Sequence, residues 1–156
     1  VRFMAQALDC KWIFLDHLSI LVSGQEEGDE RKSIDVLMTK LRSLVEQTGV
    51  GLLLVSHLRR PSGDAGHENG KEITLSHLRG SASIAHLSDS VIGLERNQQA
   101  DDDVASNTTT IRILKNRYTG ETGVATHLYY DKETGRMKEI DNPYEIDNNN
   151  GEEAPF

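Results

Sequence analysis

The first half of the chain alternates short apolar runs with polar segments. Residues 12–15 and 52–55 are apolar runs of strand length, and each is followed by polar residues. Runs of this kind are typical of parallel strands that are buried on both faces. Residues 1–8 have the pattern of the end of a helix. We therefore expect two buried strands preceded by a short helix.

A long amphipathic stretch lies between the two apolar runs. From residue 34 to residue 45, apolar side chains recur at steps of three and four positions, which is the spacing of one helix face. Asp29 is the expected N-cap, and the helix is expected to end near Gly49. A helix between two strands predicts a right-handed parallel crossover, and so an α/β architecture.

The second half of the chain has a different pattern. Residues 58–71 are rich in Gly, Pro, Arg and His without periodicity, which predicts a long loop of the kind used for binding. Residues 74–88 predict one or two short helices, and residues 90–95 predict a third strand of the same sheet. Three further segments predict an antiparallel meander, and they are residues 108–114, 124–130 and 136–140.

Composition is that of a globular protein. The 156 residues are 37% hydrophobic and 27% charged, and no apolar run approaches the roughly 20 residues of a membrane span. The single Cys10 excludes an intrachain disulfide, and the histidines lack zinc-ligand spacing, so we expect a protein of a reducing cytoplasm. A start at Val1 without an initiator methionine predicts a piece of a longer chain.

Charge is unevenly distributed along the chain. The formal net charge is -8, but residues 139–156 hold six acids and no base. The remainder is therefore close to neutral, and the net charge does not exclude nucleic acid as a partner. We expect one folded unit over residues 1–140 and an acidic, disordered tail over residues 141–156.

Two polar residues close the apolar runs. Asp16 follows the first run and His57 the second. Since the carboxyl ends of parallel strands meet at one edge of a sheet, the two side chains are expected at one ligand-binding edge. A carboxylate there fits Mg²⁺ held through water, and a histidine fits a sensor of the γ-phosphate. Taken singly, Asp16 is also an ordinary strand end, and His57 an ordinary capping histidine.

Two basic residues follow the strand that ends near Leu114. Lys115 and Arg117 have one interpretation as solvated surface charges, which is the usual place of such residues. In a second interpretation they reach a neighbouring subunit. Arg117 would then be an arginine finger that offers planar donors to the transferred phosphoryl group. The residues themselves leave both alternatives open.

Six strings occur in an order and spacing that resemble a known family. They are WIFLDH from Trp12, DERK from Asp29, SHL from Ser56, LRGS from Leu78, LSDSVIGLERNQQ from Leu87 and ILKNRYTG from Ile113. Together they resemble the DnaB-like helicase half of primase-helicases from short-tailed (T-seven-type) bacteriophages. The resemblance implies the C-terminal part of a RecA-like P-loop NTPase core, with a mostly parallel sheet, helices and an antiparallel C-terminal meander.

The resemblance also implies roles for five residues in nucleotide hydrolysis. Asp16 resembles the Walker B carboxylate that holds Mg²⁺ through water, and His57 resembles the γ-phosphate sensor. Arg117 resembles the finger that acts on a neighbouring subunit, with Lys115 beside it. Tyr130 resembles the aromatic residue that stacks on the base. The implied substrate is an NTP, either ATP or dTTP.

The same resemblance implies a path for single-stranded DNA. The loop after His57 is similar to the central-channel loop of the family, where phosphate charges make Arg59 and Arg60 the expected contacts. Lys71 and Arg79 are expected to add to them. The resemblance further implies a homo-hexameric ring that travels 5′ to 3′, a fused primase and a single-stranded-DNA-binding protein as a partner.

The end of the tail is acidic and terminates in an aromatic residue. Glu152, Glu153 and Phe156 resemble the segment by which phage helicases engage their replicative DNA polymerase. A tail that only solvates the protein is the alternative. A contact of this kind would be electrostatic and sensitive to salt.

The chain contains no Gly-x-x-x-x-Gly-Lys-Ser/Thr segment, the loop that cradles nucleotide phosphates. We therefore expect the parent protein to be an NTP-driven helicase, while this chain alone binds nucleotide weakly and does not hydrolyse it. The alternative function is a RecA-like recombinase or a non-catalytic DNA-binding assembly module.

Overall fold

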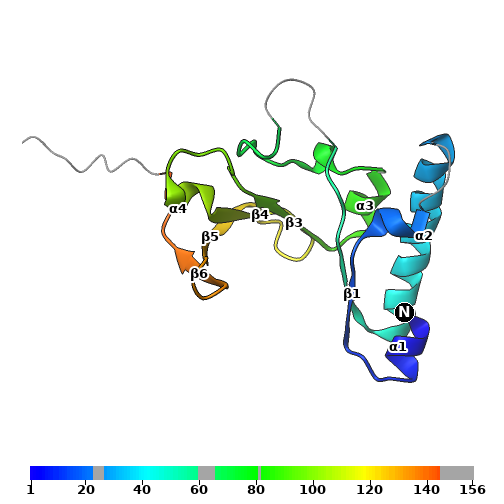
Figure 1. Ribbon diagram of the computed structural model, residues 1–156. Helices are drawn as coiled ribbons and strands as arrows, with labels where there is room; N and C mark the ends of the chain where they lie inside the picture. Colours follow the sequence, from blue (N-terminus) through cyan, green and yellow to red (C-terminus); the bar gives the residue numbers. More distant parts are fainter. Residues whose placement is uncertain (23–26, 60–65, 81, 145–156) are drawn as a thin grey trace, which may run out of the picture.

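The computed structural model describes residues 1–22, 27–59, 66–80 and 82–144. Its elements form two groups (Figure 1). Helices gather around a parallel strand pair in the first group, whose elements are α1 (Arg2–Gln6), β1 (Trp12–Leu15), η1 (Leu18–Val22), α2 (Glu27–Thr48), β2 (Gly51–Leu54), η2 (Leu75–His77) and α3 (Ala82–Leu87). The second group is mainly antiparallel sheet and comprises β3 (Ser90–Glu95), α4 (Asp103–Ser106), β4 (Thr108–Asn116), β5 (Gly123–Asp131) and β6 (Arg136–Ile140).

The strand-helix-strand unit is confirmed. β1 and β2 pair in parallel from Trp12 opposite Gly51 to Leu15 opposite Leu54, and α2 connects them. The helix begins two residues before Asp29, so Asp29 lies inside α2 and the expected N-cap was wrong. Acidic residues are favoured throughout the first helical turn as well as at the cap, and their position alone does not fix the start.

The core lies between α2, η1 and α3. Its buried residues are Leu18, Val22, Ile34, Met38, Leu41 and Ile84. Three of them, Ile34, Met38 and Leu41, are on the apolar face that the spacing predicts for α2. Leu52 and Leu54 of β2 pack against this cluster, as does Leu78. The helix is therefore fixed by its buried face, and the strand pair lies directly on the core.

The two parallel strands are covered on one face only, which corrects the expectation of strands buried on both faces. Ile13 is 4% exposed, whereas Trp12 and Phe14 are 65% and 74% exposed. Side chains alternate along a strand, so Ile13 and Leu52 meet the core while Trp12 and Phe14 lie on the opposite face. Apolar content alone therefore does not report how many faces are covered.

The third strand does not join the parallel pair. β3 instead pairs antiparallel with β4, from Ser90 opposite Asn116 to Glu95 opposite Thr110. The order β3-β4-β5-β6 makes a four-stranded sheet apart from β1-β2. The meander is confirmed, but the mostly parallel sheet is not, since the described strands make one parallel and three antiparallel pairings. Local sequence predicts a strand but not its partner.

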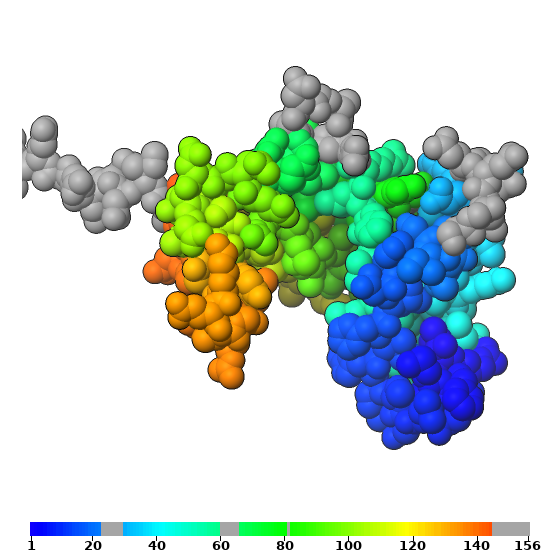
Figure 2. Space-filling model, in the orientation of Figure 1, coloured from blue at the N-terminus to red at the C-terminus, as the bar shows by residue number. Residues whose placement is uncertain are grey.

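A buried carboxylate ties β3 to the segment before η2. Glu95 is 8% exposed, and it accepts hydrogen bonds from the backbone of Ile73 at 2.8 Å and from Arg112 Nε at 2.7 Å. In Figure 2 the blue residues at the start of the chain and the orange residues around β6 lie on opposite sides of the visible face. None of the described helices is long and apolar enough to cross a bilayer.

Candidate nucleotide and DNA site

Asp16 and His57 lie at the same edge of the β1-β2 pair. The register places Leu15 opposite Leu54, and the backbone of Val55 donates to Leu15 at 2.9 Å. The segments that follow β1 and β2 therefore leave the sheet side by side, as predicted for parallel strands. Asp16 is exposed and has no ion pair with any residue that the structure describes.

A second histidine completes this edge, and sequence reasoning missed it. The rings of His17 and His57 are 4.0 Å apart between centroids and tilted by 37°. His17 Nδ1 is buried, and no described residue bonds to it. The position of His17 directly after Asp16 was the available signal. Ring contact between the two strand ends limits the orientations open to His57.

The segment after His57 is not wholly a loop, because it forms a short antiparallel ribbon with the segment after η2. Leu58 bridges Leu78, and the flanking backbone bonds are Arg59 N to His77 O at 2.8 Å and Arg79 N to His57 O at 3.0 Å. Since side chains alternate, Arg59, His57 and Arg79 lie on the face opposite Leu78. The strand-end histidine and two predicted DNA contacts therefore share one backbone unit.

These side chains line a hollow of about 900 Å³. Its described polar lining comes from separate segments of the chain and consists of Glu30, Arg31, Ser56, His57, Arg59, His67 and Arg79. Guanidinium groups match phosphate oxygens in geometry and charge, so the hollow is suited to a phosphate-bearing ligand. Arg31 lines it as well, and sequence analysis did not single it out as a contact.

Lys71, a third predicted DNA contact, is not at the hollow. Lys71 is exposed and follows the bridge between Asn69 and Asn97, and it is absent from the lining. Arg60 lies outside the described residues, as do the tail positions Glu152, Glu153 and Phe156. The structure thus brings Arg59 and Arg79 together and leaves Lys71 apart.

Lys115 is held at the end of α3. Its Nζ donates to the carbonyl oxygens of Ala85 at 2.6 Å and Ser88 at 2.8 Å, with a longer bond to His86 at 3.2 Å. The last carbonyls of a helix lack helical partners, and a cation there satisfies them. Lys115 therefore joins β4 to α3 and differs from an ordinary solvated surface lysine.

Arg117 is next to this lysine and is less confined. Its Nη2 donates to the carbonyl oxygen of His86 at 2.9 Å, and its Nη1 is 3.2 Å from Asp89 Oδ1. Arg42 shares the same carboxylate at 2.7 Å, and the hydrogen bond that Arg42 donates to Asp89 is the main cause that raises the pKa of the Arg42 guanidinium. The Arg117 side chain is 46% exposed. Its guanidinium is thus positioned yet open to solvent.

Tyr130 is far from Arg117 within one chain. Thr108, at the start of β4, pairs with Tyr129, whereas Arg117 follows the end of β4 at Asn116. Eight strand residues at about 3.3 Å each separate these ends by roughly 26 Å. The two residues, both predicted to contact nucleotide, do not meet in this chain.

The glycine after Arg79 lies close against the core. Gly80 has φ +108°, and a Cβ there would collide with Cδ1 of the buried Ile34. The Gly80→Ala variant is therefore expected to lower the free energy of unfolding by about 2–4 kcal/mol, through backbone strain and overpacking. Urea unfolding followed by circular dichroism measures this. Gly120→Ala is the matched control.

Gly120 also has a positive φ, +75°, but nothing lies within 4 Å of the added Cβ. This control should cost only the backbone part, about 1 kcal/mol. Equal losses in the two variants would contradict the proposed contact between residue 80 and Ile34.

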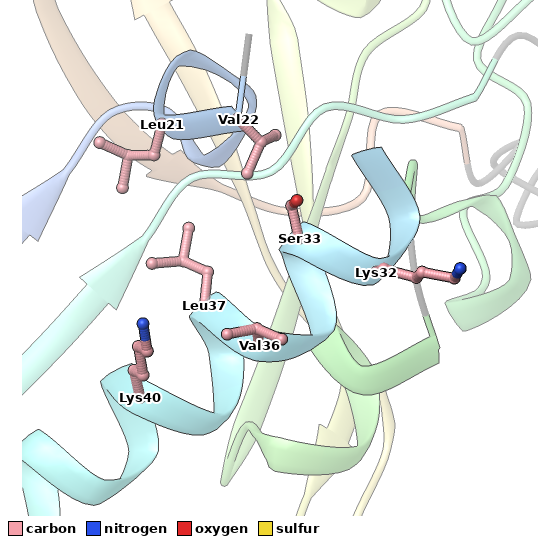
Figure 3. A pocket seen from close by; sticks show the side chains of 7 residues that line it. All are labelled: Leu21, Val22, Lys32, Ser33, Val36, Leu37 and Lys40. Carbon is pink, nitrogen blue, oxygen red and sulfur yellow. The ribbon is translucent and has the colours of Figure 1, made fainter. Parts of the chain in front are cut away.

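A second hollow lies between η1 and α2 and has a volume of about 320 Å³ (Figure 3). Aliphatic side chains line most of it, together with Lys32 and Lys40. The described residues of its lining include no carboxylate, which is the ligand type that Mg²⁺ prefers. Lys32 and the neighbouring Arg31 therefore line different hollows.

The sequence of the chain matches the model of the DnaB-like helicase C terminal domain over residues 1–139. The chain therefore belongs to the family of DnaB-like helicase C-terminal domains. It is 47% identical over 138 residues to the DNA helicase/primase of Enterobacteria phage T3. That match covers 88% of this chain and 24% of the relative, so the chain spans about a quarter of the relative's length. The resemblance inferred from the six strings is confirmed.

Proposed function

We propose that the full-length protein carrying this chain is an NTP-driven replicative DNA helicase. It forms a homo-hexameric ring, moves 5′ to 3′ on single-stranded DNA and separates the duplex at a phage replication fork. The observation that carries the proposal is the ribbon, where the backbone of Arg79 bonds to His57 beside Asp16. A residue suited to sensing a nucleotide phosphate and a residue suited to binding DNA are thus joined directly. Membership of the helicase family supports the same function.

Asp16 fits a Mg²⁺ ion held through water. It is exposed at a strand end, and the described residues contain no group of three or more His, Cys, Asp or Glu side chains that could form a closed metal site. Mg²⁺ typically keeps several waters and needs only one or two carboxylates beside the phosphates of ATP or dTTP. When bound, it would neutralise phosphate charge. Asp16 would orient a bound water, and His57 would contact the γ-phosphate.

The remaining nucleotide contacts are proposed at the boundary between two subunits. Arg117 would reach the phosphates held by the neighbouring subunit. Lys115 would fix the end of α3, to which Arg117 donates a hydrogen bond. Tyr130 would stack on a base. The distance between Tyr130 and Arg117 supports this division, since the two contacts would then serve different nucleotides. We propose that this chain alone binds nucleotide weakly and does not hydrolyse it.

Contacts with DNA and protein partners form the last part of the proposal. Arg59 and Arg79 would bind phosphates of single-stranded DNA, with Arg60 and Lys71 adding charge along the path. The tail, with Phe156 at its end, would engage a replicative DNA polymerase. A fused primase and a single-stranded-DNA-binding protein would complete the assembly.

The full-length protein tests the proposal on forked duplexes with one single-stranded tail. Strand separation is expected with NTP and Mg²⁺ when the tail has a 5′ end, and little separation when it has a 3′ end. The signal is the release of a fluorescent strand. Assembly on DNA without separation of either fork would refute the helicase and favour a RecA-like recombinase or a non-catalytic assembly module.

A further inference from the structure

Among the described residues that line the hollow at the end of the ribbon, basic side chains outnumber acidic ones. Arg31 enters it from α2, Arg59 follows β2, and Arg79 follows η2. None of the three side chains has an ion pair with any residue in the described part of the chain, and among the described residues of the lining Glu30 is the only one with a carboxylate. Among the other described arginines, Arg42, Arg112 and Arg117 pair with acids, whereas Arg2, Arg96 and Arg136 do not. What sets Arg31, Arg59 and Arg79 apart is that all three line one hollow.

Like charges that share a hollow repel one another unless an anion lies between them. A phosphate oxygen pair accepts two parallel hydrogen bonds from one guanidinium, which makes arginine the usual residue for phosphate recognition. We propose that Arg31 is a further phosphate contact for single-stranded DNA and shares this hollow with Arg59 and Arg79. The inference rests on the proposed function and adds a residue from a separate element to the DNA path.

The geometry favours a DNA phosphate over a nucleotide phosphate. Asp16, the proposed Mg²⁺ carboxylate, is not in the lining of the hollow, and His57 is the one proposed nucleotide contact that is. Three arginines from three segments also suit a chain of successive phosphates, because each can reach a different one.

The position of Arg31 on α2 makes it a fixed contact. Ile34, Met38 and Leu41 of the same helix are buried in the core, so the backbone that carries Arg31 cannot shift without disturbing that packing. Contacts on rigid elements hold their geometry better than contacts on loops. Lys32 is adjacent, has the same charge and lines the other hollow, which makes it a matched control.

Titration of the full-length protein with a fluorescent oligothymidylate at several salt concentrations tests the proposal. Arg31→Ala is expected to weaken binding about tenfold, the loss of one charged hydrogen bond, and to reduce the slope of log K against log salt by about 0.7, the value for one phosphate of a single strand. Arg31→Lys should retain the slope. Lys32→Ala should change neither quantity, and thermal unfolding checks that each variant is folded.

Several outcomes would overturn the assignment. Unchanged affinity and slope in Arg31→Ala would remove Arg31 from the DNA path, and equal losses in Arg31→Ala and Lys32→Ala would indicate diffuse charge. A higher KM for NTP in the absence of DNA, with unchanged DNA affinity, would assign Arg31 to a nucleotide phosphate. If the unmodified protein neither binds nor unwinds DNA, the proposed function fails first. If the unmodified protein unwinds DNA and only the expected effect of Arg31→Ala is absent, the proposed function stands and the role of Arg31 is refuted.

Discussion

Replacing Arg117 by alanine in the full-length protein is expected to lower DNA-stimulated NTP hydrolysis by about 10³-fold or more, while the ring still assembles. An arginine finger stabilises the charge that develops on the transferred phosphoryl group, and effects of 10³ to 10⁵ are typical. The partial exposure of the side chain leaves its guanidinium accessible to a neighbouring subunit. A coupled phosphate-release assay measures hydrolysis, and native mass spectrometry measures assembly.

Asp89→Asn is the matched control for this prediction. It removes the carboxylate that pairs with Arg117 and Arg42 but keeps both arginines. If Arg117 serves only to pair with Asp89, then Arg117→Ala and Asp89→Asn should show the same modest loss of stability, and both variants should retain hydrolysis. Mixing Arg117→Ala subunits with Asp16→Ala subunits should restore part of the activity, because some boundaries then contain both residues. Full hydrolysis by Arg117→Ala would contradict the finger.

The second large effect is expected for Asp16→Asn, which should reduce kcat for NTP hydrolysis by roughly 10²–10³-fold, the range for losing one electrostatic contact to a developing charge. The amide keeps the size of the side chain but removes the charge that we propose orients a water on Mg²⁺. Excess Mg²⁺ should restore little of the rate. Hydrolysis measured across a Mg²⁺ titration gives both quantities.

Asp9→Asn provides a comparison at the other end of β1. Asp9 pairs with Lys11 at 2.6 Å, and both side chains are mostly exposed, so this pair contributes little to stability. Asparagine also tolerates the positive φ of 51° at this position. Hydrolysis should therefore be unaffected. An unchanged kcat in Asp16→Asn as well would make Asp16 an ordinary strand end.

The parts of the fold that depend on local pattern were predictable from the sequence. The spacing of Ile34, Met38 and Leu41 gave the buried face of α2, and alternation gave the strands of the meander. The partner of β3 was not predictable, because pairing depends on contacts between residues far apart in the chain. The exposure of Phe14 was not predictable either, because an apolar run does not indicate whether one or both faces of the strand are covered by other elements.

Some residues of the candidate site were likewise predictable from the sequence, and others were not. Asp16 and His57 were identifiable because each closes an apolar run, and parallel strands bring such ends together. Arg31 and His17 gained significance only from the fold. The ribbon that joins Leu58 to Leu78 pairs two segments that are far apart in the chain. No local sequence pattern predicts a bridge of one residue pair. The contacts of Lys115 with α3 are hidden for the same reason.

The uncovered face of the β1-β2 pair has a spectroscopic consequence. Trp12 is the only tryptophan of the chain, and it is 65% exposed on that face, beside the more exposed Phe14. Its indole already meets water in the folded chain, so its emission maximum should change little when urea disrupts the distant core around Ile34. The same fluorophore should shift to shorter wavelengths when another polypeptide covers this face. Intrinsic fluorescence therefore reports on docking at β1, whereas the unfolding of this chain is followed by circular dichroism.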